Sequence, residues 1–217
     1  MDVRALMRRL GILALISGIL SVLFYLLHDI IGAMNYPGYD AMRQAVSDLT
    51  ATDAPSFAIA SGYSAVYGIF SCLCCAVLCM IIIDQRKSLR IGIYLFTAME
   101  AVSAIGYSLF PLTSAGYDGS FQSFVHVYIL TALVVMLSIA ALISLSVGGF
   151  KDGRKILGTL SVIALLCMFL GAIGTGAFPK DVFGIFERFS TYSAVIFTGA
   201  LGIYGYFGFF KEIKEAE

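Results

Sequence analysis

Six apolar runs, each long enough to cross a lipid bilayer, limit this chain to very few folds. They cover roughly residues 10–31, 57–83, 91–110, 125–147, 156–178 and 189–210. A helix rises 1.5 Å per residue, so about 20 residues cross a hydrocarbon core of about 30 Å. No run alternates in the way of a barrel strand, and helices satisfy their own backbone groups in lipid. The sequence predicts an all-α integral membrane protein with six transmembrane helices.

The composition agrees with one membrane domain spanning residues 1–217. Of the 217 residues, 59% are hydrophobic and 13% charged, with a mean hydropathy of +0.91. Such a chain has too little polar surface to cover a soluble core. All five cysteines lie inside the apolar runs, where small packing residues are the expected role. We expect membrane lipid as a partner and no nucleic acid; the oligomeric state is left open.

Basic residues predict the orientation in the membrane. Both ends of the chain and the second and fourth gaps between runs hold eleven of the fourteen Lys and Arg residues. These are Arg4, Arg8, Arg9, Arg86, Lys87, Arg90, Lys151, Arg154, Lys155, Lys211 and Lys214. Because basic residues concentrate in cytoplasmic segments, we expect both termini in the cytoplasm and the long loop 32–56 outside.

The three outer connections share one design. The three outward runs end in an aromatic residue followed by proline, at Tyr36-Pro37, Phe110-Pro111 and Phe178-Pro179. Proline stops a helix, and an aromatic ring anchors at the membrane interface. This repeat predicts three helical hairpins around an outward-facing polar cup. In the loop 32–56, apolar residues at positions 42, 45, 46 and 49 predict a short amphipathic helix.

Polar residues at this outer face form the candidate ligand-binding site. They are His28, Asp29, Arg43, Ser47, Asp48, His126, Glu187 and Arg188. They could bind a lipid head group or another small polar ligand, or simply pair with one another at the interface. Two histidines with carboxylates are weak candidates for a metal site, because no short ligand motif joins His28 to His126. We expect each histidine to bond its own loop, Ser47 and Asp48 to turn inward, and no cofactor; no catalytic residue is assigned.

Glu100 lies near the middle of the third run, where an ionisable side chain costs about 2.5–3.5 kcal/mol on insertion scales. Such a group should face the bundle interior and have partners there. Three interpretations stay open: a protonated carboxyl bonded to Ser or Tyr hydroxyls, a proton- or cation-handling group, or a residue on a water-filled cavity.

The loop 36–56 resembles the signature of a bacterial six-helix membrane family known as domain of unknown function 998. That family shows Tyr-Pro-Gly-Tyr, a Gln, Ile-Ser-(Asp/Glu)-Leu and Ala-Thr-Gly-Ala-Pro. The matching residues here are Tyr36, Pro37, Gly38, Tyr39, Gln44, Ser47, Asp48, Leu49, Ala51, Thr52, Ala54 and Pro55. Phe110-Pro111 before His126, and Gly184 before Glu187-Arg188, also fit, whereas Asp53 replaces a glycine. The resemblance implies a multi-pass protein of the bacterial plasma membrane.

A more distant similarity links the same loop to DRAM-like and GPI-lipid-remodelling membrane proteins, which implies association with lipid. Three hypotheses follow. The first is a lipid-associated protein whose outer cup binds a head group through Arg43, Arg188 and backbone donors of the loop. The second is an intramembrane, metal-dependent lipid hydrolase that uses His28 and His126. The third is a small proton-coupled transporter with Glu100 as its coupling residue.

Overall fold

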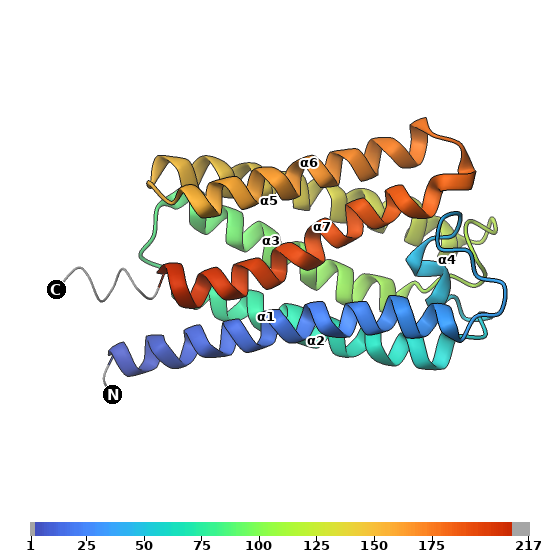
Figure 1. Cartoon of the computed structure of the whole chain (residues 1–217), viewed down its shortest axis with the longest axis horizontal. Helices are drawn as coiled ribbons and strands as arrows, with labels where there is room; N and C mark the ends of the chain where they lie inside the picture. Colours follow the sequence, from blue (N-terminus) through green and yellow to red (C-terminus); the bar gives the residue numbers. More distant parts are fainter. Residues whose placement is uncertain (1–2, 210–217) are drawn as a thin grey trace.

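The computed structural model describes residues 3–209, and within that range its regular secondary structure consists of helices joined by turns and loops (Figure 1). The α-helices are α1 (Val3–Met34), α2 (Phe57–Ile81), α3 (Lys87–Leu109), α4 (Phe121–Phe124), α5 (Thr131–Lys151), α6 (Lys155–Ala177) and α7 (Phe183–Tyr204). Short 3₁₀ helices lie at Val46–Thr50 and Lys180–Val182, and π-helical segments at Val125–Leu130 and Gly205–Phe209.

Six helical stretches are long and apolar enough to cross a membrane, which confirms the predicted fold class. They differ from the prediction mainly at their ends. The first begins at Val3, not at residue 10, because long basic side chains near a helix end can reach the interface while their stems stay apolar. The fourth joins α4, the π-helical segment and α5 into one stretch, Phe121–Lys151. Residue 210, the predicted end of the last span, lies outside the described residues.

The helices form a closed ring of three hairpins. Helix α1 packs on α2 and α7, α3 on α2 and α5, and α6 on α5 and α7. The aromatic-proline pairs lie where the outward helices stop, since α1, α3 and α6 end at Met34, Leu109 and Ala177. The connection 35–56 covers one end of the bundle, which we call the loop end; α1 starts at the opposite end (Figure 1).

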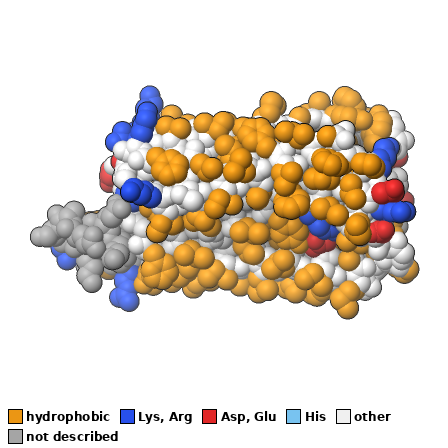
Figure 2. All heavy atoms as spheres, turned by 45° about the horizontal axis from the view of Figure 1, so that its top comes forward, with side chains coloured by type: hydrophobic (Ala, Val, Ile, Leu, Met, Phe, Trp, Pro, Cys, Tyr) orange, Lys and Arg blue, Asp and Glu red, His pale blue; other side chains and the backbone are white. Residues whose placement is uncertain are grey.

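The surface of the bundle fits a lipid environment. Hydrophobic side chains cover the visible side of the molecule, and most of the visible charged groups gather at its two ends (Figure 2). Large apolar side chains on several helices, such as Ile69, Met136 and Leu166, are more than half exposed. Such a belt would be unfavourable in water, so it marks the membrane-facing surface.

Helix α7 runs obliquely across the bundle, from α6 near the loop end towards α1 near the opposite end (Figure 1). Glycines permit both close approaches. A Cβ on Gly174 of α6 would overlap the Phe186 ring, and one on Gly202 of α7 would come within 2.5 Å of the Ala14 carbonyl oxygen of α1. Because α7 leaves one neighbour to reach another, α6 and α7 diverge along the bundle.

The orientation in the membrane is a prediction that cysteine labelling can check. We expect Met42→Cys, in the loop end, to react with a membrane-impermeant maleimide in intact cells, because the charge bias places this end outside. Lys87→Cys, in the connection at the opposite end, should react only after the membrane is permeabilised. The native cysteines lie within the spans and provide the background. The reverse labelling pattern would overturn the predicted topology.

Candidate functional site

The loop 35–56 folds down as a plug on the loop end of the bundle. Val46, Leu49 and Ala51 are at most 1% exposed, and Leu49 packs against Gly32 of α1. The plug is tied to the connection between α3 and α4, since the Thr52 N–H donates to the Leu112 carbonyl oxygen at 2.8 Å. The predicted outward cup is therefore filled by its own loop rather than open.

The predicted amphipathic helix is present only in its second half, as the 3₁₀ helix Val46–Thr50 that buries Val46 and Leu49, whereas the residues around Met42 form turns. The reason is competition for backbone carbonyls. The carbonyl oxygens of Ala41 and Gln44 accept from Arg188, and that of Met42 accepts from the Gly184 N–H at 2.8 Å. Those oxygens are bound to α7, so bonds to α7 take the place of an α-helical ladder here.

Arg188 of α7 is the centre of the polar network beneath the plug. Its guanidinium makes a two-point ion pair with Asp29 of α1, with Nη2–Oδ1 at 2.8 Å and Nε–Oδ2 at 3.0 Å. Tyr192, one turn further along α7, donates its hydroxyl to the same Asp29 carboxylate at 2.8 Å. A two-point Arg–carboxylate pair fixes geometry strongly, so this contact holds α7 in register with α1.

The rest of the guanidinium binds the loop. Arg188 Nη1 donates to the carbonyl oxygens of Ala41, Gln44 and Gly184 at 2.7, 3.1 and 3.2 Å, and Nη2 donates to the Tyr39 hydroxyl at 2.8 Å. Tyr39 in turn donates to the Ala45 carbonyl oxygen at 2.7 Å. Burial raises the pKa of the Tyr39 hydroxyl, so it stays protonated as a donor at neutral pH. Every N–H of Arg188 thus has an acceptor within the protein.

Two carboxylates fasten the 3₁₀ helix at both sides. Glu187 accepts from the Val46 N–H at 3.3 Å. Asp48 accepts from the N–H groups of Ala45 at 3.2 Å and Gly116 at 2.9 Å. Burial raises the pKa of the Asp48 carboxyl above its ordinary value, while these two N–H donors act in the opposite direction. The predicted inward turn of Asp48 is seen, with backbone donors as its partners instead of histidine or arginine.

The other proposed site residues do not all meet at this network. Arg43 is exposed and lies 3.5 Å from carboxylate oxygens of Asp40 and Asp181. Ser47 is half-buried, and its carbonyl oxygen accepts from the Thr50 hydroxyl. Arg43 therefore lies at the exposed rim of the plug, and Ser47, which was expected to turn inward with Asp48, is only half-buried.

The two histidines lie on helices that are not neighbours in the ring, because α1 packs on α2 and α7 whereas His126 belongs to the α4–α5 span. His126 Nδ1 lies 2.7 Å from the Phe110 carbonyl oxygen, the local bond that the sequence predicted. His28 is 4% exposed and forms no hydrogen bond to any described residue, contrary to the expectation of a bond to its own loop. Within residues 3–209, no group of three or more His, Cys, Asp and Glu side chains is arranged to hold a metal.

Glu100 faces the bundle interior, as expected for an ionisable group at this depth. It is 1% exposed, and its carboxyl oxygens accept from the Tyr67 hydroxyl of α2 at 3.1 Å and the Thr198 hydroxyl of α7 at 2.8 Å. Glu100 thereby joins α3 to α2 and α7. The hydroxyl partners match the interpretation of a hydrogen-bonded interior carboxyl.

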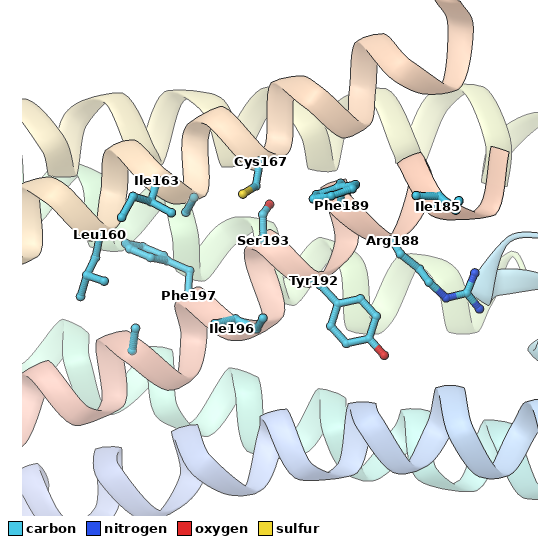
Figure 3. A pocket seen from close by; sticks show the side chains of 12 residues that line it. Leu160, Ile163, Cys167, Ile185, Arg188, Phe189, Tyr192, Ser193, Ile196 and Phe197 are labelled. Carbon is cyan, nitrogen blue, oxygen red and sulfur yellow. The ribbon is translucent and has the colours of Figure 1, made fainter. Parts of the chain in front are cut away.

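A lateral groove of about 490 Å³ lies between α6 and α7, where these helices diverge. Its lining is almost wholly apolar and includes Leu160, Ile163 and Ala164 of α6 and Phe189, Ile196 and Ala200 of α7. Figure 3 shows the Arg188 stem at the loop end of the groove, with its guanidinium turned towards the loop. The volume falls in the range of about 300–1,000 Å³ that is usual for small-molecule sites.

Tyr39, Tyr192 and Gly184 are parts of the network that the candidate list lacked. Tyr39 and Gly184 belong to the loop and α7 motifs, but a motif gives no partner, and the contacts span about 150 residues of sequence. The groove had no sequence signal of its own, because it arises from the angle between two helices. Glycines at positions 171 and 174 mark only the closest approach of α6 and α7.

The fold and the buried ion-pair network define a multi-pass, six-span helical membrane protein with its loop end closed by a plug. The model of a protein family of unknown function, DUF998, matches residues 3–204, nearly the whole chain. The chain therefore belongs to the DUF998 family. No curated protein and no solved structure gives a significant match, and the distant likeness to DRAM-like proteins is not shown.

Proposed function

We propose that this protein binds a membrane lipid from the side, with one acyl chain in the groove between α6 and α7. The observation that supports the proposal is the groove itself: an apolar hollow lined by residues that also face the surrounding membrane. Ile163 and Ile196 both line it and are more than half exposed. In a bilayer this surface faces the hydrocarbon core, so the apolar molecule that can enter the groove most directly is the acyl chain of a lipid.

The groove is longer than the depth of one leaflet, so it has room for one chain. From Ile185 to Ala200, the groove follows α7 for fifteen residues, or about 22 Å at 1.5 Å per residue. One leaflet contributes about half of the 30 Å hydrocarbon core. A single acyl chain can therefore lie in the groove with its end towards Leu160 and its head group towards the loop end.

The head group would then lie beside the rim of the plug. Because the N–H groups of Arg188 are all bound within the protein, Arg188 shapes the loop end of the groove and is not the head-group ligand. Arg43 is the better candidate, since it is exposed and its contacts with the Asp40 and Asp181 carboxylates, both 3.5 Å long, are weak. An exposed pair of this kind contributes little by itself and can exchange partners with a phosphate. We place this lipid binding in a bacterial plasma membrane.

Filling the groove tests the proposal. We expect Ala200→Phe to reduce cross-linking to a phospholipid with a photoreactive acyl chain by about tenfold, because a buried apolar contact of this size contributes about 1.5–3 kcal/mol. The adducts should map in the wild type to α6 and α7 residues that line the groove. Ala98→Phe, an equal change at an exposed position of α3, is the matched control and should leave cross-linking unchanged. Equal labelling of all three proteins, or adducts spread evenly over the surface, would reject the groove as the lipid site.

A further inference from the structure

His28 of α1 has two polar side-chain atoms, and both are buried without a partner among the described residues. The ring is 4% exposed, and neither Nδ1 nor Nε2 forms a hydrogen bond to the described residues. A neutral imidazole carries one donor and one acceptor, and leaving both unmet inside a protein is unfavourable. Buried polar atoms of this kind are usually satisfied by ordered water.

The Tyr25 ring, which packs against His28, lies between two polar groups that are otherwise separate. On one side is the Asp29–Arg188 pair, to which Tyr192 donates its hydroxyl. On the other side is Glu100, bonded to the Tyr67 hydroxyl. The Tyr25 ring joins them: it packs edge-on against His28, Tyr67 and Tyr192, with ring centroids 5.3, 4.9 and 5.4 Å away.

These side chains come from four helices, α1, α2, α3 and α7, and together they make one polar region in the bundle interior. The titratable and charged groups that act on His28 are Tyr25 and Asp29 of α1 and Arg188 of α7, and Tyr67 of α2 and Tyr192 of α7 pack on the far sides of Tyr25. Around Glu100 the titratable groups are Tyr67, Cys72, Cys74 and Cys75 of α2. If these residues had only a structural role, apolar side chains at the same positions would give a more stable fold.

We propose that His28 binds water inside the bundle and that this water completes a proton-transfer path between Glu100 and His28. The Tyr67 hydroxyl, which donates to Glu100 in the structure, first turns its O–H towards the water. The protonated Glu100 carboxyl then gives its proton to the Tyr67 oxygen while Tyr67 passes its own hydroxyl proton to the water. The water passes a proton to the free ring nitrogen of His28. One O–H bond breaks at Glu100 and one N–H bond forms at His28, which leaves a carboxylate and an imidazolium; Tyr67 and the water are unchanged.

The path has a reason to end at His28. Burial opposes an imidazolium at His28, the negative charge of the neighbouring Asp29 favours it, and Arg188 opposes it more weakly. The side chain of Asp29 is 11% exposed, so the proton reaches the edge of the buried region at this residue. The protein would then take up and release one proton from its loop end, independently of lipid in the groove.

Dicyclohexylcarbodiimide, which reacts with protonated carboxyls in apolar surroundings, tests the path on the purified full chain. We expect adducts at Glu100, located by mass spectrometry, to decrease as pH rises, because deprotonation removes the reactive acid. In His28→Gln, which keeps a donor and an acceptor for water but cannot take the proton, the decrease should move to higher pH by at least one unit. Comparing the variant with the wild type at each pH cancels the pH dependence of the reagent, and Glu100→Gln gives the blank.

A second variant distinguishes bound water from an imidazole that is merely unsatisfied. If water is bound, His28→Phe removes a hydrogen-bonded site, and we expect a lower melting temperature than for the wild type. If the site is dry, the same change removes an unmet polar group, and the melting temperature rises. A rise, or Glu100 labelling with the same pH profile in wild type and His28→Gln, would overturn the proposal.

Discussion

Arg188→Met is expected to destabilise the protein by about 3 kcal/mol, the lower end of the usual cost of removing one partner of a buried ion pair, because the side chains of Arg188 and Asp29 are still 17% and 11% exposed. The substitution leaves the Asp29 carboxylate without its two-point partner. It also frees the carbonyl oxygens of Ala41 and Gln44 and the Tyr39 hydroxyl, which together hold the plug. The measurement is the thermal unfolding of detergent-purified protein, together with proteolysis of the loop 35–56.

Two further variants separate the ion pair from a general effect of lost charge. Arg43→Met removes an exposed arginine of the same loop end, whose ion pairs contribute about 0–1 kcal/mol, so little change is expected. Asp29→Asn combined with Arg188→Met removes both charges and should be less destabilised than the two single losses added together. Additive losses, or equal effects of the Arg43 and Arg188 changes, would show that the Asp29–Arg188 ion pair does not hold the plug on the bundle.

Gly184→Ala is expected to lift the plug from α7. A Cβ at this position would lie 2.3 Å from the Gln44 carbonyl oxygen and 2.4 Å from that of Ala41, and both are backbone atoms that cannot rotate away. The same residue donates its N–H to the Met42 carbonyl oxygen. Overpacking of this kind costs about 1–3 kcal/mol or more, and here it also displaces acceptors of Arg188.

The expected signs are a lower melting temperature and faster proteolysis within residues 35–56 than in the wild type. Gly62→Ala is the matched control, because Gly62 lies near the start of α2 with nothing within 4 Å of the added Cβ. In that variant the helix propensity of alanine should leave stability equal or slightly higher. A Gly184→Ala protein as stable and as resistant to protease as Gly62→Ala would contradict the close approach.

The architecture was readable from the sequence because a bilayer imposes length and polarity on each span. Six apolar runs and three aromatic-proline stops predict six helices, and most of their ends to within a few residues. The exceptions are α1, which begins seven residues earlier than predicted, and the last span, which begins at Lys180 instead of residue 189 and whose predicted end at residue 210 lies outside the described residues. Glu100 could also be assigned to the interior, since an ionisable group is costly against lipid. Local patterns suffice for such features because the membrane acts on each helix separately.

The candidate site was only partly readable. The sequence singled out Asp29, Asp48, Glu187 and Arg188, and the structure gives all four a role in holding the plug. It also singled out His126 and His28 as a pair, yet these lie on helices that do not adjoin. Which outer residues meet depends on the order of helices around the ring, and hydropathy does not encode that order.

The loop shows why a local pattern can mislead. Its apolar spacing at positions 42, 45, 46 and 49 is helical, but an α-helix needs its own carbonyl oxygens, and Arg188 and Gly184 take those of Ala41, Met42 and Gln44. The sequence by itself determined six spans, most of their ends and an interior Glu100, because each follows from the energy of a residue in lipid. Only the tertiary structure decided the plug, the groove between α6 and α7 and the unpartnered His28, because these depend on contacts between segments far apart in the chain and on the crossing angle of α7.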